Sequence, residues 1–538
     1  MHQSCTLYDE DSFLEIHQWQ SGCRGKFQSA STPCGQLLQS SCNILMNASN
    51  DSPFYSIPLE IASSIFHLAL SKPPPLSLPA LPFSGEEVGG SHTSPFLLGA
   101  VCRSWRQTIW TSPVLWSTIT CKLCQPPSTE YIEIMQGWLK RSGCYPLTIS
   151  IYDRNPSLGQ ILVKDPVVNS LIELFNQYSE RWQTLDVFLP SELLSLFCKD
   201  RPKPPMLRTL TILASNGSFN CHLDLKKATP RALKLSAHPR FDSIEIIWSK
   251  LSQVELWYTP TKQLLQLLAW APRLELLKIV KVEGDCSPSH AILHDHLRSI
   301  FLKPLVYYCR SGPLLSPKLA FEFFLDAVIF PRLETFHYEG YGSLPSSMLT
   351  SLFKRSQCSL LSFSARYGHT GRHGDLMDLL EAIPTVRRLD LMSSGESRNT
   401  SKLLRRLVRT INPTQKNLFL PDLEFLNVFA GVSISWDALA QIFEPVPSLS
   451  SPNHRPLQTI QLGLDSCNIL SPISWCIDKT LLPRFLAIKD AGFNIQFYCK
   501  VAVDKFERLD LLAQSVAHYA CLDQAEGYMS ATLGSLTL

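Results

Sequence analysis

The sequence has no long apolar run, no secretory leader and no marked excess of one charge, and each absence narrows what the protein can be. The best candidate for a membrane span, FEFFLDAVIF at 321–330, carries two acids, whereas a spanning helix needs about 20 apolar residues. The first thirty residues contain no basic segment followed by an apolar core, so no secretory signal is indicated. We therefore expect an intracellular protein, cytoplasmic or nuclear, that does not associate with membranes.

Motifs for phosphate binding and for common catalytic sites are also missing. Neither G-x-G-x-x-G nor G-x-x-x-x-G-K-[ST] occurs, which argues against the usual nucleotide-binding loops. No G-x-S-x-G elbow and no pair of carboxylates stands out. A net charge of +3 over 538 residues does not indicate a nucleic-acid partner. The sequence therefore predicts a binding protein rather than an enzyme, with no cofactor and no metal ion.

The cysteines and histidines offer three weak candidates for a metal site. They are the lone C-x-x-C pair of Cys121 and Cys124, the group of His290, His294 and His296, and the loop residues His369 and His373 with Asp375. The cysteine pair lacks the two further ligands that a zinc ion needs, and the loop group lacks a fourth ligand. The first histidine group contains an i, i+4 pair, but Ala291 stands where a zincin has its glutamate. We interpret that group as surface histidines and the 17 cysteines as thiols.

Residues 57–119 carry the most informative pattern in the chain. Four apolar residues at helical spacing predict a first helix: Ile57, Ile61, Ile65 and Leu68. Pro58 stands where a proline in the first turn is tolerated. A second short helix is predicted to place four residues on one face: Leu98, Val101, Cys102 and Trp105. A third element contains Pro113, Leu115 and Trp116. So small a unit does not need three tryptophans, and such an apolar excess indicates packing onto a neighbour.

This segment resembles an F-box of the diverged form found in fungal F-box proteins. The resemblance rests on I-P-x-E-I-x-x-x-I-F, L-G-x-V-C-R-x-W-R and W-x-x-P-x-L-W. It implies an F-box-like helical domain over 53–122, with a loop insert at 71–95, that binds the Skp-type adaptor of SCF (cullin–RING) ubiquitin ligases. The matched adaptor-binding positions are Ile57, Pro58, Ile61, Ile65, Val101, Cys102 and Trp105. The alternative is a small helical cap on the following domain.

From residue 145 to about 500 the chain repeats a short L-x-x-L-x-Φ segment, often after a proline. The clearest copies are 205–212, 272–279, 331–338, 384–391 and 421–428, and weaker ones are 182–187, 230–235, 251–256, 302–307, 360–363 and 457–462. Amphipathic stretches such as 261–271 and 374–383 separate them. The period-2 core of each copy predicts a short strand with one buried face, and the following helix returns the chain for the next parallel strand.

This alternation resembles a leucine-rich-repeat array, with PLTISIYD at 146–153 as its first strand. The Asn or Cys that ends the strand of regular repeats is missing from most copies, so we expect an irregular solenoid. The fold class is therefore α+β or α/β, a small all-helical domain followed by a solenoid of strands and helices over 145–500. The alternative is a doubly wound α/β sheet.

The remaining segments complete the predicted organisation. Residues 1–52 are expected to be a poorly ordered tail, and residues 501–538 a helical cap or tail. KLLRRLVR at 402–409 is predicted to be a solvated helix face bearing Lys402, Arg405, Arg406 and Arg409. The function expected from the resemblance is a substrate-recognition subunit of an SCF ligase, in which the repeats bind a target protein. The alternatives are a repeat scaffold for protein–protein interaction outside any ligase, and a hydrolase or transferase with an unrecognised site.

Overall fold

The structure, a computed structural model, divides into two compact units, residues 1–116 with 141–143 and residues 117–140 with 144–538. It describes residues 57–70, 95–123, 127–153, 159–197, 206–214, 222–225, 228–236, 240–283, 291–303, 318–340, 343–370, 375–393, 398–409, 419–430, 436–443, 456–465, 476–500 and 508–534. The predicted tail at 1–52 and nearly all of the predicted insert at 71–95 lie outside these residues.

The first unit is helical where it is described. It contains α3 (Leu59–Leu70), α4 (Pro95–Val101), α5 (Arg103–Thr111) and the 3₁₀ turn η2 (Pro113–Trp116). Trp116 is fully buried, and its indole Nε1 donates a hydrogen bond of 2.8 Å to the Ile109 carbonyl oxygen. Phe96 packs edge-to-face on Trp116, with 5.3 Å between ring centroids. The third predicted element, at 113–116, is therefore the core of this unit.

The second unit is a mixed α/β structure built on one large, mainly parallel sheet. Its strands, in spatial order, are β1 (Thr118–Lys122), β2 (Leu147–Tyr152), β3 (Trp182–Leu189), β4 (Thr209–Ala214), β6 (Ala232–Leu235), β8 (Gln253–Leu256), β10 (Leu276–Ile279), β13 (Ser299–Leu302), β15 (Thr335–Glu339), β17 (Ser362–Tyr367), β19 (Arg388–Ser393), β20 (Phe425–Ala430), β21 (Thr459–Asp465), β22 (Asn494–Lys500) and β23 (Arg508–Asp510). The first fourteen are parallel, and β23 is antiparallel to β22. Each strand pairs with the next in the chain order of this sheet, so the sheet is not doubly wound.

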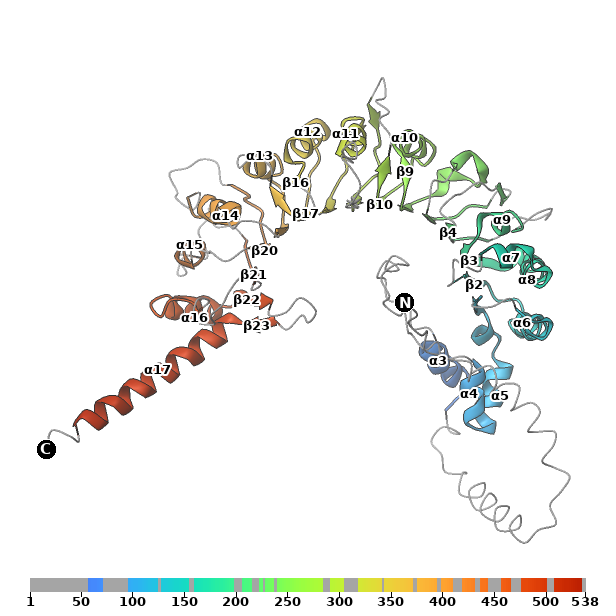
Figure 1. Ribbon diagram of the computed structural model, residues 1–538, viewed down its shortest axis with the longest axis horizontal. Coiled ribbons are helices and arrows are strands. Elements are labelled where there is room, and N and C mark those ends of the chain that lie inside the picture. The colour runs from blue at the N-terminus through green and yellow to red at the C-terminus, as the bar shows by residue number, and fades with distance from the viewer. Residues whose placement is uncertain are drawn as a thin grey trace, which may run out of the picture. The chain divides into compact units, whose positions relative to one another are not determined.

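The helices of the second unit alternate with these strands (Figure 1). They are α6 (Thr129–Arg141), α7 (Gly159–Lys164), α8 (Pro166–Asn176), α9 (Ser191–Leu194), α10 (Thr261–Trp270), α11 (Lys318–Asp326), α12 (Ser346–Ser356), α13 (Asp375–Glu381), α14 (Arg398–Arg409), α15 (Trp436–Gln441), α16 (Leu482–Asp490) and α17 (Leu511–Gly534), with 3₁₀ turns η4 (Ser179–Arg181), η5 (Phe241–Ser243) and η6 (Trp248–Lys250). From α10 to α13 each helix contacts the next. The helix predicted within 501–538 is α17.

Four two-stranded parallel sheets lie beside the large one. They pair β5 (Leu223–Asp224) with β7 (Ile244–Glu245), β9 (Thr259–Pro260) with β11 (Val282–Glu283), β12 (Ile292–Leu293) with β14 (Val328–Ile329), and β16 (Ser343–Leu344) with β18 (His369–Thr370).

Alternate residues of each strand form one continuous core beneath the helices. In β10, Leu277 and Ile279 are buried, and in β15 the buried residues are Phe336 and Tyr338. Register places Leu277 beside Ile300, which in turn lies beside Phe336. The core therefore continues from strand to strand. The intervening residues face the other side of the sheet, away from α10–α14 (Figure 1).

The predicted segments match most strands of the large sheet, and β22 (Asn494–Lys500) was not predicted. Of the copy at 302–307, residues 304–307 lie outside the described residues, and the described strand at this place, Ser299–Leu302, meets the copy only at Leu302. Residues 118–122, placed by sequence in the helical domain, form β1, whose residues pair in register with β2. The helical unit accordingly ends at Trp116 rather than at 122, and 146–153 supplies the second strand rather than the first.

Candidate functional site

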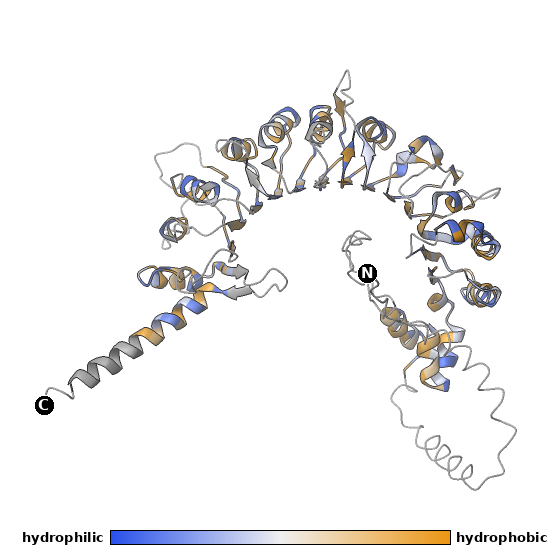
Figure 2. Ribbon diagram, in the orientation of Figure 1, coloured by the Kyte–Doolittle hydropathy of each residue, from blue (hydrophilic) through white to orange (hydrophobic). Residues whose placement is uncertain are grey.

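An exposed apolar surface covers much of α3. Leu59, Ile61, Ile65 and Leu68 are all exposed, Leu68 to 73%. The buried residues of the helix are Ala62 and Phe66, and Figure 2 shows the helix largely in hydrophobic colours. Folding of this unit thus leaves apolar side chains in water, an arrangement typical of a surface that binds a partner.

The residues predicted to bind the adaptor lie at three places in this unit. Pro58 directly precedes α3, and its carbonyl oxygen accepts hydrogen bonds of 3.0 Å from the N–H groups of Ile61 and Ala62. Ile61 and Ile65 are exposed on α3, whereas Ile57 is half-buried before the helix. The start of α3 is therefore open to a partner.

The prediction of a single second helix is wrong, because the helix is interrupted at Cys102. Val101 ends α4 and is 61% exposed. Cys102 has extended backbone (φ −157°), and its Sγ accepts a hydrogen bond of 3.4 Å from the Trp105 N–H, so it caps α5. The Trp105 ring packs edge-to-face on Phe66 at 4.8 Å. Val101, Cys102 and Trp105 thus do not share one helix face, and Trp105 is partly committed to the core of the unit.

Sequence reasoning missed two exposed leucines, Leu59 on α3 and Leu97 on α4. The sequence pattern does not mark either leucine as exposed, because both lie within apolar helical segments. Their exposure depends on which side of each helix packs inward, and that is set by contacts between helices. The exposed apolar residues of this unit therefore include two outside the seven predicted positions.

The open face of the sheet carries a second candidate surface, which is polar. Strand register aligns one row of residues across it: Thr120, Ser150, Asp186, Thr211, Lys234, Glu255, Lys278, Phe301, His337, Ser364, Asp390, Asn427, Gln461 and Gln496. Thirteen of these fourteen side chains can form hydrogen bonds, and Phe301 is the exception. No pattern in the linear sequence marks this row, because it exists only through the register.

Ion pairs and hydrogen bonds link neighbouring strands on this face. Glu339 on β15 pairs with Lys303 at 3.2 Å and with Arg366 on β17 at 3.3 Å. Asn427 Nδ2 donates to Asp390 Oδ1 at 3.0 Å. Burial raises the pKa of Asp390 above its ordinary value, and the Asn427 hydrogen bond partly offsets that rise.

His337 lies near these charged groups on the same face. Burial lowers the pKa of His337 below its ordinary value, against the opposing effect of the nearby carboxylates of Glu339 and Asp390. Its ring centroid is 5.4 Å from that of Phe301. A neutral imidazole at this position can either donate or accept a hydrogen bond.

The weak metal candidates do not assemble among the described residues. Cys121 is buried in β1 with its Sγ 3.8 Å from the Met135 sulfur, and burial raises the pKa of its thiol to about 12. Its predicted partner Cys124 lies outside the described residues. In the part of the chain that the structure describes, no three His, Cys, Asp or Glu side chains are grouped closely enough to hold a metal ion.

The histidine interpretation needs one correction. His294 is buried rather than on the surface, in the segment after β12, and its Nε2 lies 3.0 Å from the Ala271 carbonyl oxygen. Burial accordingly lowers its pKa. His296 is exposed, as expected. His290 and His373, with the side chains of His369 and Asp375, lie outside the described part of the structure.

The cationic segment at 402–409 forms part of α14. Lys402, Arg405 and Arg406 are exposed, whereas the neighbouring leucines of the helix are buried. Arg406 pairs with Glu381 on α13 at 2.9 Å. The side chain of Arg409 lies outside the described set. The prediction of a solvated helix face is confirmed for the three described residues.

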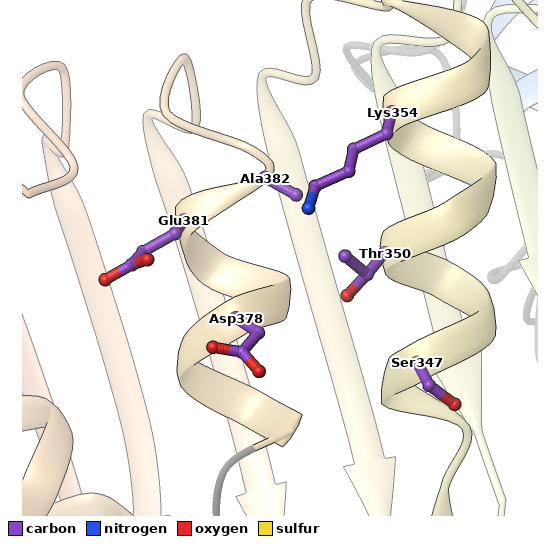
Figure 3. A pocket seen from close by; sticks show the side chains of 6 residues that line it. All are labelled: Ser347, Thr350, Lys354, Asp378, Glu381 and Ala382. Carbon is purple, nitrogen blue, oxygen red and sulfur yellow. The ribbon is translucent and has the colours of Figure 1, made fainter.

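A shallow groove of about 480 Å³ separates α12 from α13 (Figure 3). It is lined by Ser347, Thr350, Lys354, Asp378, Glu381 and Ala382. This lining is mainly polar, whereas sites for small ligands are mostly apolar with a few placed polar groups. The groove is therefore a gap between two surface helices rather than a ligand pocket.

The sequence matches neither the profile of a known protein family nor any curated protein. None of the described helices combines the length and the apolar character needed to cross a membrane.

Proposed function

We propose that this protein is a substrate-recognition subunit of an SCF-type cullin–RING ubiquitin ligase. The helical unit would bind the Skp-type adaptor, and the sheet unit would bind the target protein. Catalysis would belong to the other subunits of the ligase. The observation that carries the proposal is the exposed apolar surface of α3, which contains matched F-box positions Ile61 and Ile65.

The second unit supports the target-binding role. We propose that it is an irregular leucine-rich-repeat solenoid, since its parallel strands follow chain order and alternate with helices on one face. Such an architecture leaves the other face of the sheet free over many strands. That face is the surface we assign to the target protein.

Co-expression with a Skp-type adaptor tests the first half of the proposal. We expect the wild-type chain to co-purify with the adaptor, and Ile61→Glu/Ile65→Glu to lose it, because two carboxylates would have to be buried without partners in the interface. Ile161→Glu/Leu293→Glu is the matched control, since both residues are exposed apolar side chains of the sheet unit. Retention of the adaptor by the α3 variant at the wild-type level would refute the proposal.

Trp105 gives a less direct test than its position in the motif suggests. Trp105→Ala would remove the contact with Phe66 as well as any contact with the adaptor. A loss of binding in this variant is informative only if thermal denaturation shows that the helical unit remains folded. The α3 variant avoids this difficulty because its two substituted side chains already face water.

A further inference from the structure

The open face of the sheet is most strongly charged between β10 and β19. Four cations lie there on four strands: Lys278 on β10, Lys303 following β13, Arg366 on β17 and Arg388 on β19. Together with His337 on β15 we call these residues the basic strip. Register places Lys278 two strands from His337 in one row, and Glu339 directly beside Arg366.

The carboxylates of this region lie deeper than the cations. The Glu339 side chain is 22% exposed, against 31% for Lys303 and 57% for Arg366, and it forms an ion pair with each of these two cations. Asp390 is half-buried and accepts a hydrogen bond from Asn427. A protein that approaches the strip would therefore meet the cationic groups first.

The two remaining cations lie over aromatic rings. Lys278 Nζ is 5.4 Å from the Phe301 ring centroid, and the Arg388 guanidinium carbon is 3.9 Å from that of Phe425. A ring attracts a cation through its quadrupole but leaves the hydrogen-bond donors available. Four cations against the two carboxylates of Glu339 and Asp390 leave a local charge of +2 between β10 and β19. Glu255 on β8 lies beside Lys278, but its charge is balanced by Lys234, with which it pairs at 3.6 Å.

We propose that the basic strip binds an extended acidic segment of the target protein. Guanidinium groups bind carboxylates through paired hydrogen bonds, which favours Arg366 and Arg388 as the main contacts. The rings of Phe301 and Phe425 offer adjacent apolar contact. This inference rests on the proposed function only in assigning the segment to a ligase target.

The spacing of the strands sets the length of the segment. The strip covers five adjacent strands, β10, β13, β15, β17 and β19. Four intervals of about 4.8 Å give about 19 Å, which corresponds to about six residues of extended chain. A segment of that length with two or more Asp or Glu residues can reach cations at both ends of the strip.

Selection from a peptide-display library of random 12-residue sequences tests the proposal on the full-length chain. We expect the selected sequences to be enriched in Asp and Glu. A synthetic peptide of a selected sequence should bind with a Kd that rises at least tenfold in Arg366→Gln/Arg388→Gln and increases with salt concentration. Replacing the Asp and Glu residues of the peptide by Asn and Gln should weaken its binding to the wild-type chain in the same way.

The controls separate loss of the strip from loss of the fold. Lys402→Gln/Arg405→Gln removes the same charge from exposed positions on α14, and it should leave the peptide Kd unchanged. In Arg366→Gln the Glu339 carboxylate keeps Lys303 as a partner, so we expect the variant to fold. If circular dichroism shows that Arg366→Gln/Arg388→Gln is unfolded, Lys278→Gln/Arg388→Gln is used as the strip variant in its place.

Two outcomes would overturn the inference: selected peptides no more acidic than the library, or equal affinity for the wild-type chain and the strip variants. Its failure is distinguishable from failure of the proposed function. Arg366→Gln/Arg388→Gln should keep the adaptor, whereas Ile61→Glu/Ile65→Glu should lose the adaptor and keep the peptide.

Discussion

Leu389→Ala should strongly destabilise the middle of the large sheet. Leu389 is fully buried in β19, where register places Phe363 on one side and Leu426 on the other, both also fully buried. The substitution removes three carbon atoms, which corresponds to about 2.4 kcal/mol of transfer free energy at about 0.8 kcal/mol each. Two parallel strand pairings hold the backbone of β19, so the site cannot collapse, and the residual cavity raises the total to about 4 kcal/mol.

Urea denaturation followed by circular dichroism measures the loss, with Leu486→Ala as the matched control. Leu486 lies on α16 and is 40% exposed, so its truncation should cost about 1 kcal/mol or less. In Leu389→Ala, hydrogen exchange should show faster opening of β17, β19 and β20 than of β2–β4, because each strand of the large sheet pairs with its neighbours in chain order. Equal midpoints for the two alanine variants would show that the assignment of Leu389 to the core is wrong.

Three further outcomes follow from individual side chains. Gly463→Ala should lower the urea midpoint, because an added Cβ would lie within 3 Å of two neighbouring aromatic rings, whereas Gly99→Ala should be tolerated since its nearest atom would be 3.8 Å away. For His294, the folded-state pKa lies below the ordinary value of about 6.5, so its contribution to stability is present above pH 6.5 and is lost as the pH falls towards the folded-state pKa. His294→Gln should therefore flatten the fall of the urea midpoint between pH 7 and 5.5, and an unchanged slope would contradict the burial of this ring. Iodoacetamide should label exposed Cys102 in the native protein and reach Cys121 only after unfolding, as peptide mass spectrometry would show.

The strands of the large sheet were largely predictable from sequence because each one carries its own signal. In PRLELLKI and PTVRRLDL the apolar residues recur with period 2 after a proline-led turn, and these segments contain β10 and most of β19. β22, at 494–500, has the same alternation in NIQFYCK but no preceding L-x-x-L, so the pattern did not find it. β22 therefore lacked the pattern that introduces most of the other strands.

The candidate surfaces were less accessible to sequence reasoning. The pattern of α3 shows apolar residues around much of the helix, and it cannot say which of them pack inward. Only the contacts with α5 and η2 determine that Phe66 is buried and Ile65 is not. Cys102 resembled an interior helical residue because flanking residues continue the period, yet its extended backbone divides the segment into two helices.

The basic strip also could not be predicted from sequence, because its residues are far apart along the chain. Lys278, Lys303, Arg366 and Arg388 belong to different strands, and nothing in the intervening sequence connects them. Parallel pairing of adjacent strands brings them onto one face, and Glu339 is less exposed than the cations with which it pairs. The charge of this face of the sheet is therefore a property of register rather than of composition. For that reason a chain with a net charge of only +3 can still present a cationic surface to an acidic partner.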